Sequence, residues 1–230
     1  MDNTLRSLLH LLQLSDSALP VGGFSFSNTL ESAVAYGVVR DAPSLEEFLF
    51  SALQTASTTD CVAARVAFEA SLAGRLDMVA RADEELLLRK LNAEQRQMTL
   101  RMGRKLAELA EGVIGAELLA GWLAMIKSGE VAGTYAVTQG VVFAASGVGQ
   151  RALFASMLYG TATMMLNASL RLMRLTHHST QQILYRLAES MDSLYDASAR
   201  LGIEDMYGFA PQIDLLSALH EKGRSRMFMN

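Results

Sequence analysis

The sequence predicts an all-α protein, a single-domain helical bundle that spans residues 1–230. Three prolines occur in the 230 residues: Pro20, Pro43 and Pro211. The interval from 44 to 210 therefore lacks the strongest helix breaker, and long helices are permitted there. One stretch of this interval places apolar residues at three- and four-residue steps, with one gap, as on one face of a helix: Leu184, Leu187, Met191, Leu194 and Leu201. Convincing period-two alternation, the pattern of a half-buried strand, is absent.

Start and stop signals place two further helices near the N-terminus. Asn28 followed three residues later by Glu31 resembles a capping box. Gly37 can end that helix in a left-handed conformation, so we expect a short helix over about 29–36. Ser44 and Glu47 repeat the start signal for the next helix.

The middle of the chain is poor in charge. From 112 to 170 the charged residues are Glu117, Lys127, Glu130 and Arg151. We expect this part to form the centre of the bundle, with some glycines at turns or close helix contacts, because an interior helical glycine costs about 1 kcal/mol relative to alanine. Residues 152–170 are uncharged and as long as a membrane-spanning helix, but their polar content favours a buried helix of a globular domain. No linker or repeat divides the chain.

Composition argues against some classes of ligand and location. The 20 Lys and Arg are balanced by 24 Asp and Glu, and the net charge of −4 argues against nucleic acid as a ligand. Cys61 is the only cysteine, so an intrachain disulfide is impossible and a cytoplasmic location fits. Asp2 precedes the first apolar stretch, which argues against a secretory leader. Half of the residues are hydrophobic and 19% are charged, so we expect a partner, or a second copy in a homodimer, to cover apolar surface.

The sequence lacks patterns that carry chemistry. The serines do not stand in a Gly-x-Ser-x-Gly elbow, and the glycine-rich segment 146–149 lacks the Lys-Ser/Thr ending of a phosphate-binding loop. His177 and His178 are adjacent, which favours a solvated turn over a metal site, whose ligands usually lie three or four residues apart. His220 and Glu221 supply two possible metal ligands, too few for a closed site. The sequence therefore predicts no catalytic residues, no cofactor and no resident metal.

Motifs at both ends of the chain resemble those of a known family. Residues 18–27, Ala-Leu-Pro-Val-Gly-Gly-Phe-Ser-Phe-Ser, lead into Leu30-Glu31. The C-terminal part carries three more matches: Phe209-Ala210-Pro211, His220-Glu221 and Ser225-Arg226-Met227-Phe228. Together they resemble the UreF family of urease accessory proteins, and Met102-Gly103-Arg104-Lys105-Leu106 is a weaker match between them. Two segments depart from the family's pattern, Gly133–Tyr135 and Thr176–Ser179.

The resemblance implies an all-α homodimer that assembles with UreD and the GTPase UreG on the urease apoprotein and promotes nickel insertion. It also implies partner-binding residues within the motifs: Phe24, Ser25, Glu31, His220, Glu221, Arg224, Arg226, Met227 and Phe228. Two other functions stay open. One is control of the UreG GTPase cycle, and the other is an unrecognised helical enzyme with an apolar pocket.

Two segments are expected to present these residues. Pro20 and the glycine pair that follows it shape a loop that can offer Phe24 as an aromatic anchor, whereas Phe26 fits an anchor or the local core equally well. The C-terminal tail, 223–230, follows the last predicted helix. We expect this tail, like the N-terminus, to be flexible until a partner orders its arginines and apolar side chains, and the alternative is an ordinary frayed end.

Overall fold

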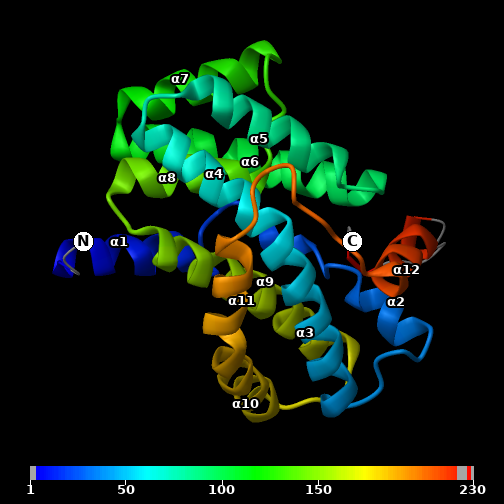
Figure 1. Cartoon of the computed structure of the whole chain (residues 1–230). Helices are drawn as coiled ribbons and strands as arrows, with labels where there is room; N and C mark the ends of the chain where they lie inside the picture. Colours follow the sequence, from blue (N-terminus) through cyan, green and yellow to red (C-terminus); the bar gives the residue numbers. More distant parts are fainter. Residues whose placement is uncertain (1–3, 222–226, 229–230) are drawn as a thin grey trace.

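Helices form every regular element in the residues that the computed structural model describes, 4–221 and 227–228 (Figure 1). The all-α prediction is confirmed. The α-helices are α1 (Leu5–Ser15), α2 (Leu30–Ala35), α3 (Ala42–Thr58), α4 (Asp60–Leu72), α5 (Leu76–Leu88), α6 (Ala93–Ile114), α7 (Glu117–Ser128), α8 (Tyr135–Ser146), α9 (Gln150–Leu172), α10 (His177–Leu187), α11 (Met191–Ala199) and α12 (Pro211–Glu221). Two short 3-10 turns are η1 (Gly23–Ser25) and η2 (Ala188–Ser190).

The charge-poor middle of the chain forms the interior only in its second part, from α8 onward, whereas α7 is an outer helix that buries Leu119, Trp122, Leu123 and Ile126. Helix α8 is buried at every position from 136 to 144, and it packs against α4 on one side and α6 on another. Gly140 makes the first of these contacts possible, because a Cβ atom built there would lie 2.3 Å from the carbonyl oxygen of Ala64. The apolar faces of α8 are thus covered within one chain, so they supply no surface for a homodimer.

Helix α6 approaches the start of α8 equally closely. A Cβ atom on Gly103 would lie 2.0 Å from the carbonyl oxygen of Gly133, which itself has a left-handed φ of +73°. The buried carboxylate of Asp83, from α5, accepts hydrogen bonds from the backbone N–H groups of Gly133 and Thr134 at 2.8 and 2.6 Å. It therefore satisfies amide groups that precede the first turn of α8. The divergent segment Gly133–Tyr135 has a structural role in this contact.

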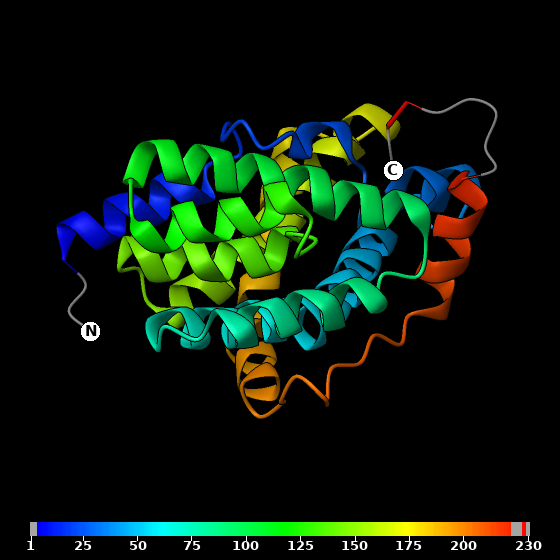
Figure 2. The same cartoon turned by 90° about the horizontal axis from the view of Figure 1, so that it is seen from above.

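Helix α9 contains the uncharged stretch 152–170 and is an internal helix of the bundle. Leu153, Leu158 and Met165 are fully buried along it. It contacts α1, α2 and α3, and the view in Figure 2 shows α1 extending away from the rest of the molecule. None of the helices in the described part of the chain combines the length and apolar content that crossing a membrane requires.

Two of the predicted helix starts differ from the structure. Asn28 does not cap α2, because Asn28 and Thr29 adopt left-handed φ values of +51° and +72°, and the backbone N–H of Glu31 instead donates to the Ser27 hydroxyl. Helix α3 begins three residues earlier than the Ser44 signal suggested. Asp41 is its N-cap, and its carboxylate and the Ser44 hydroxyl accept hydrogen bonds from each other's backbone N–H groups.

Other boundaries agree with the sequence in part. Gly37 follows α2 with a left-handed φ of +70°, as predicted. The amphipathic stretch from Leu184 to Leu201 is divided by η2 into α10 and α11. Leu187 and Leu194 are nonetheless both buried, because the short turn preserves the direction of the apolar face.

The close approach of α6 to α8 makes a direct prediction. We expect Gly103→Ala to lower the free energy of unfolding by about 1–3 kcal/mol or more, because the backbone atoms beside the new Cβ cannot move independently. Gly112→Ala, in the same helix with open space around the new Cβ, should instead be neutral or stabilising by up to about 1 kcal/mol. Urea unfolding of both variants measures the difference, and equal effects would contradict the packing described.

Candidate partner-binding site

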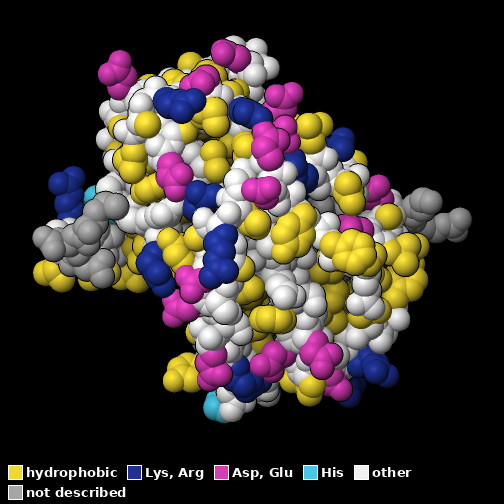
Figure 3. Space-filling view, viewed as in Figure 1, with side chains coloured by type: hydrophobic (Ala, Val, Ile, Leu, Met, Phe, Trp, Pro, Cys, Tyr) yellow, Lys and Arg dark blue, Asp and Glu magenta, His cyan; other side chains and the backbone are white. Residues whose placement is uncertain are grey.

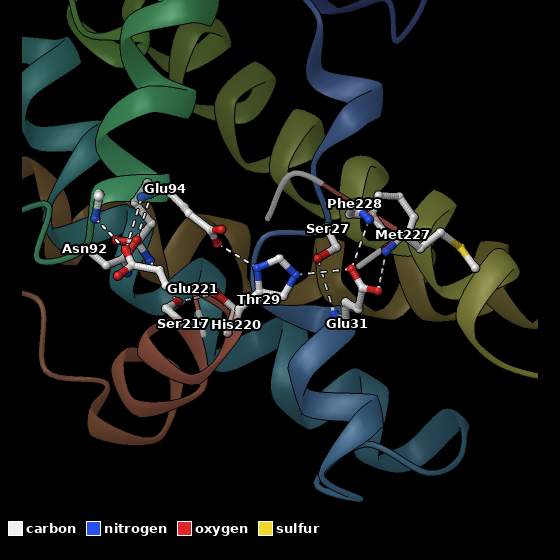
Figure 4. Close-up of polar contacts among 12 residues, drawn as sticks. Ser27, Thr29, Glu31, Asn92, Glu94, Ser217, His220, Glu221, Met227 and Phe228 are labelled. Atoms are coloured by element: carbon white, nitrogen blue, oxygen red, sulfur yellow. Dashed lines mark hydrogen bonds and ion pairs between the residues drawn. The ribbon is translucent and has the colours of Figure 1, made fainter. Parts of the chain in front are cut away.

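The imidazole of His220 lies buried between two carboxylates (Figure 4). Its Nδ1 atom is 2.6 Å from an oxygen of Glu94, and its Nε2 atom is 3.2 Å from an oxygen of Glu31. The three residues come from α12, α6 and α2, so this contact ties three helices together. We call Glu31, Glu94 and His220 the His220 junction.

Both ring nitrogens of His220 have a hydrogen-bond partner in the junction. A carboxylate oxygen faces each of the two nitrogens, and the tautomer of the ring decides which nitrogen donates. Hydrogen bonds to an ionised carboxylate are stronger than neutral ones, and a buried polar ring needs such partners to offset its lost hydration. His220 is therefore fully engaged in the protein's own structure.

Glu31 also holds the C-terminal segment Met227–Phe228. One carboxylate oxygen accepts the backbone N–H of Met227 at 2.7 Å, and the other accepts that of Phe228 at 3.0 Å. Burial alone would raise the pKa of Glu31, but the hydrogen bonds from Met227, His220 and Phe228 outweigh it and lower the pKa below the ordinary value of 4.5. The ionised form of Glu31 is thus the one that the segment stabilises.

Two aromatic side chains from opposite ends of the chain meet at one guanidinium. The charged group of Arg171 lies 4.4 Å from the centre of the Phe228 ring and 5.4 Å from that of Phe24. Phe24 is 73% exposed, whereas Phe228 is 5% exposed. Phe26 is buried in the core, so it is a core residue and not an exposed anchor. Phe228 was expected to offer a free apolar anchor, but the structure places it against Arg171.

Glu221 stabilises the start of α6. One of its carboxylate oxygens accepts the backbone N–H groups of Ala93 and Glu94 at 2.7 and 3.3 Å. These amides are among those that a helix start leaves without partners, and the helix dipole favours a negative charge there. Beside it, the hydroxyls of Thr29 and Ser217 form a buried hydrogen bond of 2.6 Å. Helix α12 is therefore bonded to both α2 and α6.

The structure brings together most of the residues that the sequence motifs suggested. Six of the nine lie around the His220 junction: Phe24, Glu31, His220, Glu221, Met227 and Phe228. Ser25 is exposed in η1 beside Phe24. Arg224 and Arg226 lie outside the described residues, as do most of the tail 223–230 and residues 1–3.

Sequence reasoning missed two residues of this site. Glu94 lies in a stretch crowded with charges, where it looks like any solvated carboxylate, although its side chain is 13% exposed. Arg171 lies in the last turn of the largely apolar helix α9 and belongs to none of the motifs found in the sequence. Their pairing with residues more than 50 positions away is a property of the folded chain, so no local pattern could have shown it.

The comparisons with known proteins decide the family. Urease accessory protein UreF 1 of Brucella melitensis biotype 1 is 47% identical over 227 residues, covering 99% of this chain and 94% of that protein. Urease accessory protein UreF of Yersinia enterocolitica is 44% identical over 223 residues, covering 97% and 98%. The UreF family model matches residues 39–188. This chain belongs to the UreF family.

The two kinds of similarity cover different parts of this UreF-family protein. The family model includes Glu94 but ends before α12 and begins after Glu31. The full-length relatives extend over nearly all of the chain, well beyond the residues that the family model matches. The His220 junction therefore joins the part matched by the family model to the two ends of the chain.

The second divergent segment, Thr176–Ser179, forms an ordinary helix start. The hydroxyl of Thr176 accepts the backbone N–H of Ser179 at 3.1 Å and caps α10. His177 and His178 are exposed in the first turn of that helix, not in the solvated turn that the sequence suggested. Among the described residues no group of three or more His, Cys, Asp or Glu side chains is arranged to hold a metal ion.

A separate apolar surface lies beside the site. Figure 3 shows hydrophobic side chains gathered over α2, α12 and the connection that precedes α12. The large exposed apolar residues of these segments are Tyr36, Tyr207, Phe209 and Leu215. Phe209, from the Phe-Ala-Pro motif, is 86% exposed. This motif therefore places an aromatic ring on the surface instead of in the core.

Glu31→Gln tests the electrostatics of the junction. At pH 7 we expect it to lower the free energy of unfolding by about 1.5–3 kcal/mol, because charge-assisted hydrogen bonds become neutral ones. A carboxyl group whose pKa is lower in the folded than in the unfolded protein stabilises the fold at pH values above its unfolded pKa. This stabilisation is lost as the pH falls through the folded pKa. The difference between wild type and variant should therefore shrink below pH 4.5, as Glu31 itself becomes protonated.

Urea unfolding at several pH values between 7 and 3 measures this difference. Glu108→Gln is the matched control, because Glu108 pairs with the exposed side chains of Arg104 and Lys105. Exposed pairs contribute about 0–1 kcal/mol, so the control should change little at any pH. A Glu31→Gln effect that is no larger than the control, or that persists undiminished at pH 3, would refute the assignment.

Proposed function

We propose that this UreF-family chain is a non-catalytic adaptor that assembles with UreD and the GTPase UreG on the urease apoprotein and promotes nickel insertion in the cytoplasm. The observation that carries the proposal is the 44–47% identity, over nearly the whole chain, to proteins named urease accessory protein UreF. The adaptor role is the one that the family resemblance implied.

The chemistry of the site supports an adaptor over an enzyme. The ionisable groups of the His220 junction are bonded to one another and to backbone amides, so they hold the protein's own segments in place. A general base or nucleophile must instead reach a substrate. The exposed groups nearby, Phe24 and Met227, are apolar and suit contact with another protein.

We propose that Phe24, Ser25 and Met227 contact UreD. They lie on the surface near the half-buried Glu31 and the buried residues His220 and Phe228, whose role is to position them. Aromatic side chains on a well-supported surface are the residues that dominate binding energy at interfaces. Arg224 and Arg226, outside the described residues, remain proposed contacts because guanidinium groups bond carboxylates in a forked geometry.

We also propose a homodimer, and α1 offers a surface for it. Leu5, Leu9 and Leu12 are at least 65% exposed on this helix, at spacings of four and three residues. Such a stripe is complementary to itself in a second copy related by a twofold axis. Arg6 is the one Lys, Arg, Asp or Glu residue of this helix, so little charge loses its hydration when a second copy covers the helix.

Phe24→Ala tests the adaptor proposal. Since this ring is largely exposed, the variant should keep the stability of the wild type, whereas binding to purified UreD should weaken about 10- to 30-fold, as at an interface hot spot. Urease activation in cells that express the other accessory proteins should fall in parallel. Tyr185→Ala, which removes an equally exposed ring on α10, is the control and should change neither.

The readouts are co-purification with UreD and UreG, urease activity, and GTP turnover by UreG with and without the chain. A change in GTP turnover alone would indicate the regulator of UreG instead of the adaptor. Undiminished UreD binding and urease activation by Phe24→Ala would count against the proposed contact. Light scattering of the purified chain should give the mass of two copies, and a strict monomer would exclude the homodimer without excluding the adaptor.

A further inference from the structure

A cavity of about 580 Å³ has Phe228 in its lining, the residue whose backbone N–H donates to Glu31 of the His220 junction. Its size falls within the range of about 300–1,000 Å³ that is usual for ligand sites, whereas protein interiors otherwise contain few voids larger than a water molecule. Much of its lining is thioether and apolar side chains, including Met98, Met102, Met157 and Met164. Methionine side chains adapt their shape to different apolar groups, so such a lining can accept a ligand without a fixed outline.

Several residues of the lining are exposed, Asp16 and Asn167 among them. Phe24, Arg171 and Phe228 form one group within the lining, joined by the contacts of Arg171 with the two rings. We call them the cavity mouth, because Phe24 and Arg171 also contact solvent. Phe228 is buried there and belongs to no helix. The segment Met227–Phe228 is held by its hydrogen bonds to Glu31 and by the stacking of Phe228 against Arg171. Phe228 can therefore leave without breaking any helical hydrogen bond.

Arg171 has a charge that no carboxylate balances in the described part of the chain. Its contacts there are the faces of two aromatic rings, which attract a cation through the ring quadrupole. A carboxylate would bond the guanidinium in a forked geometry and more strongly than a ring face does. The cavity mouth thus combines an apolar space with an unmatched positive charge.

We propose that the cavity is a binding site for a partner segment that presents an apolar side chain beside a carboxylate, and that Phe228 occupies the cavity mouth until such a segment displaces it. The apolar side chain takes the place of the Phe228 ring, and the carboxylate pairs with Arg171. This proposal depends on the proposed adaptor role in one respect, since it assumes that the chain has protein partners. Its test uses the purified chain alone, so it can fail independently of urease activation.

Cys61 reports whether the cavity opens. It is the single cysteine of the chain, it is buried, and it lines the cavity. Burial raises the pKa of its thiol well above the ordinary value, so the wild type should react slowly with iodoacetamide. Phe228→Ala should speed alkylation of Cys61 at least about 10-fold, measured by mass spectrometry under native conditions. Ile183→Val, a buried change in α10 away from the cavity lining, controls for faster global unfolding and should react nearly as the wild type does.

Two peptides then test the chemistry of the occupant. Acetyl-Leu-Phe-Asp-Leu-amide should bind Phe228→Ala and slow its Cys61 alkylation, whereas the matched Asn peptide should bind at least about 5-fold more weakly. Phe228→Ala combined with Arg171→Gln should lose this preference. The dye anilinonaphthalene sulfonate, an aromatic anion, tests whether the site takes a small molecule instead of a peptide. Saturable binding of this dye without binding of either peptide would mean that the site takes a small organic anion and would overturn the partner segment.

If Phe228→Ala does not fold cooperatively, Glu31→Gln provides the second variant, since it keeps the ring and weakens the bonds that hold its backbone. It should speed Cys61 alkylation more than Ile183→Val does. Alkylation at the wild-type rate in every folded variant would show that Phe228 does not close the cavity, and the proposal would then be abandoned.

Discussion

A buried imidazole between two carboxylates determines how the ends of this chain meet its helical core. His220, Glu31 and Glu94 lie on three helices, and each would be costly to bury without the other two. Their mutual bonds place α12 against α2 and α6. The segment Met227–Phe228 and the exposed ring of Phe24 then take their positions from Glu31 and Arg171.

The rest of the helical bundle gives this junction a rigid support. Helix α8 is almost entirely buried, and glycines allow α4 and α6 to approach its backbone directly. Close packing of this kind resists deformation, because even one added carbon atom must displace neighbouring backbone. The less regular segments lie at the surface, where the loop with Phe24 and the connection with Phe209 present aromatic rings. The proposed adaptor role would use this combination of a stiff core and exposed anchors.

The sequence predicted features that depend on local pattern and composition. The helical class, the interior position of α8 within the charge-poor middle and the stop at Gly37 are of this kind. Terminal motifs indicated which residues form the site, but not that Glu31 and His220 face each other, since 189 positions separate them. Asp41 replaced Ser44 as a cap because both residue types can start a helix, and only the packed chain selects between them. The cavity arises from packing across several helices, and no sequence pattern encodes it.

The central claim is that Glu31 and His220 stabilise the protein through their contact with each other. A double-mutant cycle with Glu31→Gln, His220→Gln and the double variant, measured by urea unfolding at pH 7, tests this most directly. The account predicts a coupling free energy of about 1.5–3 kcal/mol, because each single substitution weakens the charge-assisted hydrogen bond and leaves the remaining partner less well satisfied. Additive effects within about 0.5 kcal/mol would show that the two side chains act independently and would contradict the account.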